Sequence, residues 1–426
     1  MSKPKEIAPK LRFPEFCDFK WEITPLRALA DKVTERNRNN AITRVFTNSA
    51  IEGVVDQGDY FDRSIANQSN LTNYFVVEPG DYVYNPRISI SAPVGPVSKN
   101  KLGTGVMSPL YTVFRFRNAE NDFYEQFFLS SLWHAYIKNL SNTGARYDRI
   151  TISDELFMNM PLPCASPEEQ RKIAACLSSI DHLIACENRK LEGLKKYKRG
   201  LMQKLLPPEG ETLPEWRFPE FRNCGRWENK KLSEIGCFIR GFSYSSEDTT
   251  DDPSKLLVLR SNNIVPFGET DYINGLQYVD KSCKEEQKLL PGDITICMAN
   301  GSKSLVGKAS CYDGNYAGDI TVGAFCGIFR SPLIITRYLF QTGQYRRMLY
   351  SILNGGDGAI ANLREDDLLG LSFAIPADRR EQQKIVGCLS EIDSLITAQS
   401  NKVEALKAHK KGLVWGLFPS LEEADI

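Results

Sequence analysis

Two long stretches of the chain carry apolar residues at alternating intervals of four and three positions. This heptad spacing predicts a helix with one narrow apolar seam, which is typical of coiled coils and differs from the broader stripe of a helix that covers a globular core. A Ser or Asp cap followed three positions later by Glu, at 166–169 and 378–381, predicts where each helix begins. The seam residues are Ile173, Leu177, Ile180, Ile184, Leu191, Leu194, Leu201 and Leu205 in the first stretch, and Ile385, Leu389, Ile392, Ile396, Val403, Leu406, Leu413 and Leu417 in the second.

The two stretches are copies of one another. Residues 169–207 return as residues 381–419, which lie 212 positions later without a gap, and about half of the positions are identical. Polar residues interrupt both seams, at Glu187 and Lys198 and again at Gln399 and Lys410. Two matching seams in one chain most simply bury each other, although two independent coils that each recruit a partner subunit remain an alternative. Periodicity alone does not distinguish a parallel from an antiparallel pair.

Shorter motifs repeat as well. Arg-Phe-Pro-Glu-Phe occurs at 12–16 and 217–221, and Pro-Gly-Asp occurs at 79–81 and 291–293, where it predicts a turn that starts a strand. The chain is therefore a tandem of two units, each a globular region followed by a long helix. The predicted boundaries are 1–165 and 208–377 for the two globular domains, and 166–207 and 378–426 for the helices, the last with a tail.

The globular regions are predicted to be mixed α/β (α+β), with short strands and few helices. In each region one helical stretch, 123–140 or 335–353, precedes a polar, glycine-bearing loop, 141–149 or 354–364. Strands are expected at 74–77, 81–84, 110–114, 293–297 and 324–329.

Composition narrows the class of protein. The 426 residues include 53 Lys+Arg and 53 Asp+Glu, so the net charge is zero and bulk positive charge cannot drive binding to DNA or to an anionic membrane. No apolar run approaches the roughly 18 residues that span a bilayer, and residues 1–5 lead into charge rather than into an export signal. The eleven cysteines form no CxxC pair, which suits the reduced thiols of a cytoplasmic protein without a membrane partner.

Motifs for catalysis are incomplete. Residues 301–309 resemble a phosphate-binding loop, but the spacing is one residue too long, and Ala309 stands where a hydroxyl must reach Mg²⁺. Asn85-Pro86-Arg87 falls short of the Asn/Asp-Pro-Pro-aromatic loop of adenine methyltransferases, and the three histidines are far apart in sequence. The sequence therefore predicts a non-catalytic chain without a metal site.

What remains is recognition by polar loops that recur at corresponding places in both halves. Arg, Lys, Asn and Tyr side chains bond phosphates and base edges. Any one of them could equally be an ordinary solvated residue, but as a set they are the candidates for DNA binding. They are Asn85, Arg87, Lys99, Lys101, Arg146, Tyr147 and Arg149 in the first half, and Asn300, Lys303, Lys308, Asn362 and Arg364 in the second.

Taken together, the chain resembles the specificity subunits of type I restriction–modification systems. The resemblance covers nearly the whole chain. It rests on the Pro-Gly-Asp strand starts, on the Gly/Asn loops that precede Leu162-Pro163 and Ile375-Pro376, and above all on Glu-Gln-x-Lys-Ile followed by the heptad helix, present twice.

The resemblance implies two target recognition domains, separated by a long intramolecular antiparallel two-helix coiled coil with approximate two-fold symmetry. Each domain would read one half of a bipartite, asymmetric and gapped site on double-stranded DNA. The coil would set the spacer and bind two modification subunits, and restriction subunits would join through these. S-adenosylmethionine, ATP and Mg²⁺ would belong to those partners, so this chain would bind no cofactor itself.

The neutral charge departs from what DNA binding favours, because DNA affinity is mostly phosphate-driven. We therefore expect the chain alone to bind DNA weakly and to need its partners. The alternative reading is a coiled-coil scaffold that binds other proteins without reading DNA. The sequence gives neither the DNA motif nor the spacer length.

Overall fold

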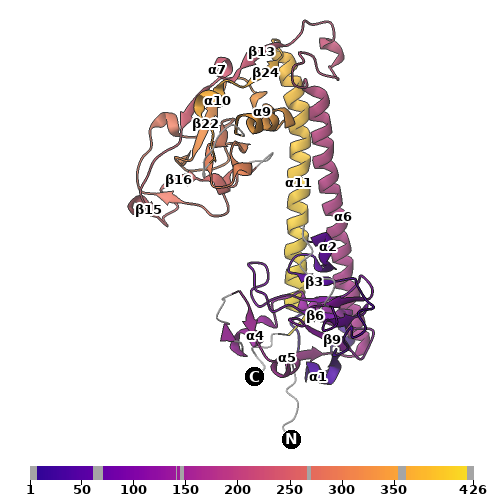
Figure 1. Ribbon diagram of the computed structural model, residues 1–426. Coiled ribbons are helices and arrows are strands. Elements are labelled where there is room, and N and C mark those ends of the chain that lie inside the picture. The colour runs from indigo at the N-terminus through magenta and orange to yellow at the C-terminus, as the bar shows by residue number, and fades with distance from the viewer. Residues whose placement is uncertain are drawn as a thin grey trace. The chain divides into compact units, whose positions relative to one another are not determined.

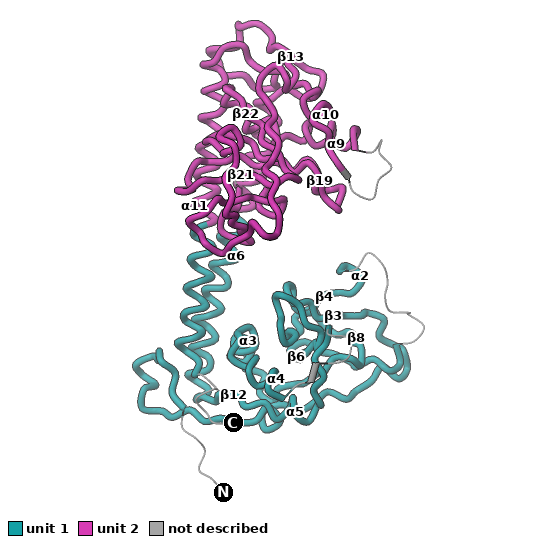
Figure 2. Tube along the Cα trace, turned by 90° about the vertical axis from the view of Figure 1, so that its left-hand side faces the viewer, with its two compact units in different colours: residues 1–189, 401–426 teal, residues 190–400 magenta. Residues whose placement is uncertain are grey.

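The structure is a computed structural model that describes residues 7–60, 71–140, 142–143, 148–265, 270–353 and 361–419. The chain forms two compact units (Figure 2). Unit 1 comprises residues 1–189 and 401–426, and unit 2 comprises residues 190–400. Each unit contains one globular domain together with part of each of the two long helices.

The first domain consists of short elements. They are η1 (Pro14–Phe16), β1 (Glu22–Pro25), α1 (Leu26–Leu29), β2 (Ala30–Lys32), β3 (Phe46–Ser49), β4 (Gly53–Asp56), α2 (Gln57–Tyr60), β5 (Phe75–Val77), β6 (Tyr82–Tyr84), β7 (Val97–Lys99), β8 (Gly105–Met107), β9 (Thr112–Phe116), α3 (Asp122–Phe128), α4 (His134–Leu140), β10 (Asn142–Thr143), β11 (Ile150–Thr151), α5 (Asp154–Met158) and β12 (Pro161–Cys164).

The second domain repeats this plan with additions. Its elements are η3 (Pro219–Phe221), β13 (Glu228–Lys231), α7 (Leu232–Ile235), β14 (Cys237–Arg240), η4 (Ser246–Asp248), β15 (Thr249–Thr250), β16 (Leu256–Leu259), η5 (Ser261–Asn263), β17 (Tyr278–Val279), η6 (Glu285–Gln287), β18 (Ile294–Cys297), β19 (Ala299–Asn300), η7 (Lys303–Leu305), β20 (Ala309–Cys311), β21 (Ile320–Val322), β22 (Cys326–Arg330), α8 (Thr336–Leu339), α9 (Gly343–Leu353), β23 (Ala361–Asn362), α10 (Glu365–Leu369) and β24 (Ser372–Ile375).

One antiparallel four-stranded sheet is common to both domains. Its strand order is β2-β9-β6-β7 in the first domain and β14-β22-β18-β20 in the second. A two-stranded sheet also recurs, as β1-β12 and as β13-β24. The second domain adds a sheet in the order β15-β17-β16-β21, in which β16 and β21 run parallel. The repeat therefore extends to the fold of the domains, where the sequences have diverged most.

The Pro-Gly-Asp turns start β6 and β18, as predicted. Gly80 and Gly292 adopt φ values of 91° and 93°, which disfavour residues with a side chain. The following carboxylates are buried, and each accepts two hydrogen bonds from an arginine on the next strand of the sheet. Asp81 accepts from Arg115 at 2.6 and 3.0 Å, and Asp293 accepts from Arg330 at 2.9 and 2.7 Å. These repeated acids therefore stabilise the sheet.

The prediction of one helix over 123–140 and one over 335–353 was wrong, because each stretch forms two helices. In the first, the hydroxyl of Ser130 donates to the carbonyl of Phe127 at 2.6 Å and accepts from the backbone N–H of Leu132. In the second, Thr342 donates to the carbonyl of Leu339 at 2.7 Å. Hydroxyls that bond the local backbone in this way compete with helical hydrogen bonds, so the helices α3 and α8 end there.

The two long helices are α6 (Pro167–Leu205) and α11 (Arg379–Leu417), seen in Figure 1. Their first turns connect to the domains through a repeated polar joint. Glu169 accepts hydrogen bonds from Arg12 (both 2.8 Å) and from the indole of Trp21 (2.9 Å). The carboxylate is fully buried, and the hydrogen bond raises the pKa of the Arg12 guanidinium.

Unit 2 contains the same joint. Glu381 accepts from Arg217 at 2.7 and 2.8 Å and from the indole of Trp227 at 3.2 Å. Exposed lysines form a second contact between the same two motifs, since Lys172 pairs with Glu15 in unit 1 and Lys384 pairs with Glu220 in unit 2. The Arg-Phe-Pro-Glu-Phe motif and the Glu-Gln-x-Lys-Ile motif, which both occur twice in the sequence, therefore contact each other in each unit.

The helices pair antiparallel within each unit. In unit 1, Lys410 lies 2.7 Å from both carboxylate oxygens of Asp181, and in unit 2, Lys198 lies 2.6 Å from Asp393. The two aspartates are equivalent in the repeat, as are the two lysines, so these ion pairs are the same contact made twice. In each pair a residue from the first half of one helix meets a residue from the second half of the other. The polar interruptions of the seam thus fix register and direction.

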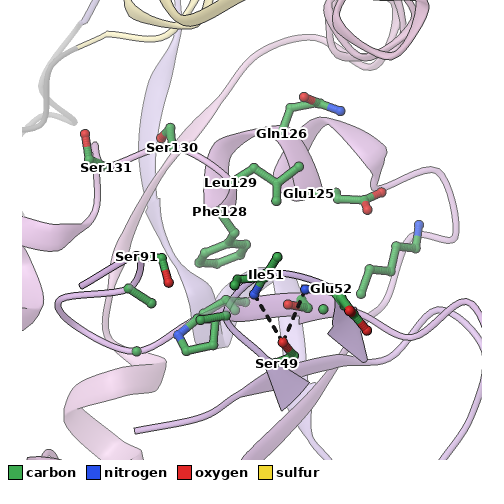
Figure 3. Close-up of a pocket in the computed structure, with 18 of the residues that line it drawn as sticks. Ser49, Ile51, Glu52, Ser91, Glu125, Gln126, Phe128, Leu129, Ser130 and Ser131 are labelled. Atoms are coloured by element: carbon green, nitrogen blue, oxygen red, sulfur yellow. Dashed lines mark hydrogen bonds between the residues drawn. The ribbon is translucent and has the colours of Figure 1, made fainter. Parts of the chain in front are cut away.

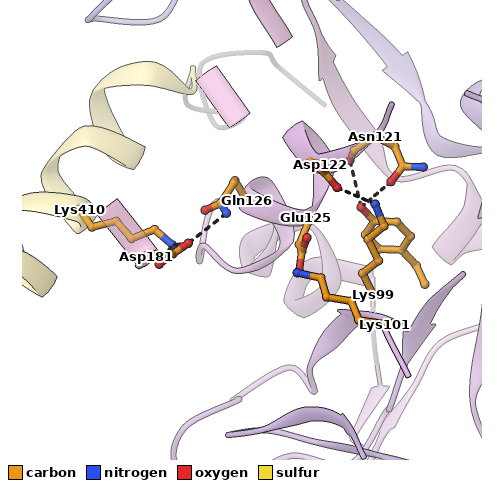
Figure 4. A network of polar contacts seen from close by, with 9 residues as sticks. Lys99, Lys101, Asn121, Asp122, Glu125, Gln126, Asp181 and Lys410 are labelled. Carbon is orange, nitrogen blue, oxygen red and sulfur yellow. Dashed lines mark hydrogen bonds and ion pairs between the residues drawn. The ribbon is translucent and has the colours of Figure 1, made fainter. Parts of the chain in front are cut away.

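The same aspartates anchor the domains to the helices. In unit 1, Gln126 of α3 donates to Asp181 at 3.1 Å, and in unit 2 the hydroxyl of Tyr338 in α8 donates to Asp393 at 2.9 Å (Figure 4 shows the first). Gln126 and Tyr338 are 212 positions apart, so the contact is conserved between the halves while the donor differs.

Apolar packing completes each unit. Ile173, Leu177 and Leu417 belong to the core of the first domain, and Leu201 and Leu389 belong to the core of the second. All sixteen predicted seam residues are buried or half-buried. The predicted fold class, mixed α/β with two globular domains and a coiled coil of two long helices, is confirmed, whereas the exact domain boundaries remain a prediction. Within the described residues no helix is long and apolar enough to cross a bilayer.

The joint leads to a stability prediction. Replacing Glu381 with Ala leaves a nearly buried guanidinium and an indole N–H without their acceptor, so we expect a loss of about 3 kcal/mol of stability. Urea unfolding followed by circular dichroism measures it. Glu220→Ala, which removes only the exposed partner of Lys384, serves as the control and should leave the transition close to that of the wild type. Equal effects of the two substitutions would contradict the prediction.

Candidate functional site

In both domains, the segment after the Pro-Gly-Asp strand pairs with the end of the polar, glycine-bearing loop. In the first domain Arg87 forms a β-bridge with Arg149, and the backbone N–H of Ile150 donates to the carbonyl of Pro86 at 2.9 Å. In the second domain β19 pairs with β23, so that Asn300 lies opposite Ala361. The structure thus brings together predicted residues from segments about 60 positions apart.

Asn85 shapes this site in the first domain. Its amide donates to the carbonyl of Asn48 at 2.8 Å and accepts from the backbone N–H of Arg87 at 3.0 Å. Asn48 is itself buried and donates to the carbonyl of Val83 at 2.7 Å. Asn85 therefore holds the loop in place, while the exposed side chain of Arg87 is available to a ligand. Asn48 was missed in the sequence because nothing there places it beside Asn85.

Asn300 has a similar part in the second domain. Its amide donates to Ser261 at 3.2 Å and accepts from the backbone N–H of Ser302 at 2.9 Å. Asn362 lies on β23 and Arg364 directly before α10, both with exposed side chains, and Lys303 is exposed at the start of η7.

Lys308 lies elsewhere. Lys308 is buried, and its backbone carbonyl accepts a hydrogen bond from the backbone N–H of Cys297 at 2.9 Å. A hydrogen bond from Cys326, directly opposite on β22, lowers the pKa of the Cys297 thiol, and the charge of Lys308 acts in the same direction. Arg146 and Tyr147 lie outside the described residues, so their part in the site remains a prediction.

Lys99 and Lys101 are separate from the paired loops. Lys99 pairs with Asp122 and Lys101 pairs with Glu125, both at 2.6 Å (Figure 4). Both lysines line a cleft of about 750 Å³ in unit 1, between the first domain and α11. Figure 3 shows Ile51, Phe128 and Leu129 on its wall, together with Ser49, whose hydroxyl accepts from the backbone N–H groups of Ile51 and Glu52.

The helix side of the same cleft is basic. Lys407, Lys410 and Lys411 of α11 line it beside Trp415. The heptad pattern places Lys410 at a polar interruption of the seam and gives no sign of Lys407 or Lys411, because it describes residues off the seam only as solvent-facing. His134 also lines the cleft, and burial lowers its pKa, which favours the neutral imidazole at neutral pH.

The geometry defines a duplicated protein with two domains of one design, each presenting polar loops. Residues 225–407 match the family described as Type I restriction modification DNA specificity domain. The Type I restriction enzyme MjaVIII specificity subunit of Methanocaldococcus jannaschii is 26% identical over 326 residues, which make up 73% of this chain and 72% of that protein.

Two further similarities are to proteins of the same kind. The Type I restriction enzyme EcoKI specificity subunit of Escherichia coli is 27% identical over 202 residues, 45% of this chain and 42% of that protein. The fold resembles the crystal structure of the type I restriction–modification system S subunit from M. genitalium, with a TM-score of 0.56 at 14% identity over 97% of this chain and 99% of that chain. These similarities confirm the resemblance to the type I restriction–modification specificity subunits that the sequence shows.

The role of Asn85 is testable. Replacing Asn85 with Ala removes the two hydrogen bonds that hold residues 85–87 in place against Asn48. The backbone pairing of this segment with 148–151 should then loosen, so we expect faster amide hydrogen exchange in both segments and unchanged exchange at 299–302 and 361–364. Hydrogen-exchange mass spectrometry measures this. Arg87→Ala is the control, because it removes an exposed side chain and keeps the backbone contacts. Unchanged exchange in Asn85→Ala would show that the loop is held by other contacts.

Proposed function

We propose that this chain reads a bipartite DNA site, one half with each domain, as the non-catalytic specificity subunit of a type I restriction–modification complex. The observation that carries the proposal is the repeated pairing of loops, which presents polar side chains at the same place in both domains. Arg87 and Arg149 lie there in the first domain, and Asn362 and Arg364 lie on and directly after β23 in the second. Different side chains in corresponding loops favour two different half-sites.

The surface of the two long helices supports a role in binding partner subunits. Leu183 and Leu395, which are equivalent in the repeat, are 42% and 56% exposed on the outside of the helices. Exposed leucines at equivalent positions favour the docking of two copies of one partner protein, and we propose that this partner is the modification subunit. In this arrangement S-adenosylmethionine, ATP and Mg²⁺ act in the partner subunits, and restriction subunits join through them.

Methylome sequencing tests the proposed readout. In cells that express this chain with its modification subunit, we expect adenine methylation at one gapped motif whose halves differ in sequence. Arg87→Ala combined with Arg149→Ala should alter only one half, and Asn362→Ala combined with Arg364→Ala should alter only the other. An ungapped or palindromic motif would count against the proposal. No sequence-dependent modification at all would favour the alternative, a protein scaffold without DNA readout.

The coil as a spacer has its own test. Seven residues inserted after Arg189 in α6 and seven after Ser400 in α11 leave both repeated ion pairs within their units. The insertion lengthens each helix by about 10 Å at 1.5 Å per residue. Since one base pair rises about 3.4 Å, we expect a gap about three base pairs longer, with unchanged half-sites, in the same methylome assay.

Insertion into α6 alone is the matched control, because it breaks the common register of the two helices and should abolish modification. An unchanged gap in the double insertion would show that the coil does not set the spacing.

A further inference from the structure

Positive charge is unevenly distributed along the two long helices. In unit 2, residues 190–205 of α6 carry six basic and one acidic side chain, and in unit 1, residues 401–417 of α11 carry four basic and one acidic. The other parts, 167–189 of α6 and 379–400 of α11, carry net charges of −1 and 0. A chain with zero net charge therefore concentrates positive charge in the second half of each repeated helix.

Two basic positions recur on the same face of both helices. Lys195 and Arg199 in α6 are one helical turn apart, and Lys407 and Lys411 are their equivalents in α11. All four side chains are exposed. Lys195 and Lys407 each contact an acid one turn earlier, Glu192 at 2.8 Å and Glu404 at 2.7 Å, and such exposed pairs are weak. Arg199 and Lys411 have no ion-pair partner among the described residues.

In each unit a cleft lies between this basic face and the recognition domain. In unit 1 the cleft of about 750 Å³ is lined by Lys407 and Lys411, with Lys99 and Lys101 on the domain. In unit 2 a cleft of about 390 Å³ is lined by Arg199, with Arg347 on the domain. The two clefts are equivalent, because residues 411, 414 and 415 of one correspond to 199, 202 and 203 of the other. The repeat has therefore kept both clefts and one basic side chain on the helix wall of each, Lys411 or Arg199.

We propose that the basic pair in each unit, Lys195 with Arg199 and Lys407 with Lys411, binds phosphates of duplex DNA without reading its sequence. This inference rests on the proposed function and adds a second, sequence-independent contact to it. Cationic side chains on a regular helix can neutralise backbone phosphates and release their counterions, which supplies affinity that a neutral chain otherwise lacks.

Charge favours DNA over a protein as the occupant of these faces. Protein interfaces have apolar cores that are depleted in lysine. The exposed leucines that suit such a core, Leu183 and Leu395, lie on the neutral parts of the helices. The basic parts also expose Tyr197 and Trp415, so it is charge that divides each helix into a neutral part and a part suited to a polyanion.

The experiment measures DNA affinity against salt concentration for the full chain in complex with its modification subunit, on a duplex containing the methylated motif. Lys195→Gln with Arg199→Gln, and separately Lys407→Gln with Lys411→Gln, should each reduce the slope of log K against log salt by about 0.9 per lost phosphate contact. The methylated motif should not change. Gln has a helix propensity close to that of Lys and Arg, so the helices should persist.

Two further variants sharpen the test. Lys195→Arg with Lys407→Arg and Lys411→Arg retains the charge and should retain the slope. Glu192→Gln with Glu404→Gln removes the acids beside the basic pairs and should increase affinity. An intact complex with an unchanged slope in the Gln variants would overturn the inference, as would loss of the modification subunit from those variants, which would make the faces a protein-docking surface. Absence of specific binding by the wild-type complex would instead refute the proposed function.

Discussion

A buried carboxylate at the start of each long helix joins that helix to its domain. Glu169 and Glu381 are almost completely removed from water, and each neutralises an arginine and accepts from a tryptophan of the segment that opens its half of the chain. A charge in such a place is stable only when its partners are present, and removing one partner is costly. The joint therefore connects the beginning of each domain sequence to its end, and the short sheets β1-β12 and β13-β24 lie beside it.

The repeat explains why so much of the fold was predictable. Heptad spacing and the caps predicted α6 to within two residues at each end and the start of α11 to within one residue, because a narrow apolar seam has few other interpretations. The cap at Ser166 is present, with its hydroxyl accepting from the backbone N–H of Glu169. The antiparallel direction needed three-dimensional contacts, since periodicity is the same in both directions. The breaks after α3 and α8 were missed because the hydroxyls of Ser130 and Thr342 act locally, within a pattern that still reads as helical.

The candidate site was predictable in part. Asn85 and Asn300 were chosen as ligand contacts, but their amides hold the loops that carry the other candidates. Lys308 looked like a loop residue and is buried. These contacts could not be predicted, because a polar side chain in a loop has the same sequence signature whether it faces a ligand or its own backbone. The basic faces of the helices were missed for a different reason, since a heptad pattern describes only the seam.

The aspartates at 181 and 393 accept from a lysine of the opposite helix and from the neighbouring domain at once. The acceptor is constant, whereas the donor on the domain is an amide in one half and a phenol in the other. Each long helix thus presents one aspartate to its neighbouring domain. The domain needs to supply only one hydrogen-bond donor there, and the sequence around that donor can differ. Domains with new loops can be exchanged on such a frame without redesign of the helices that carry them.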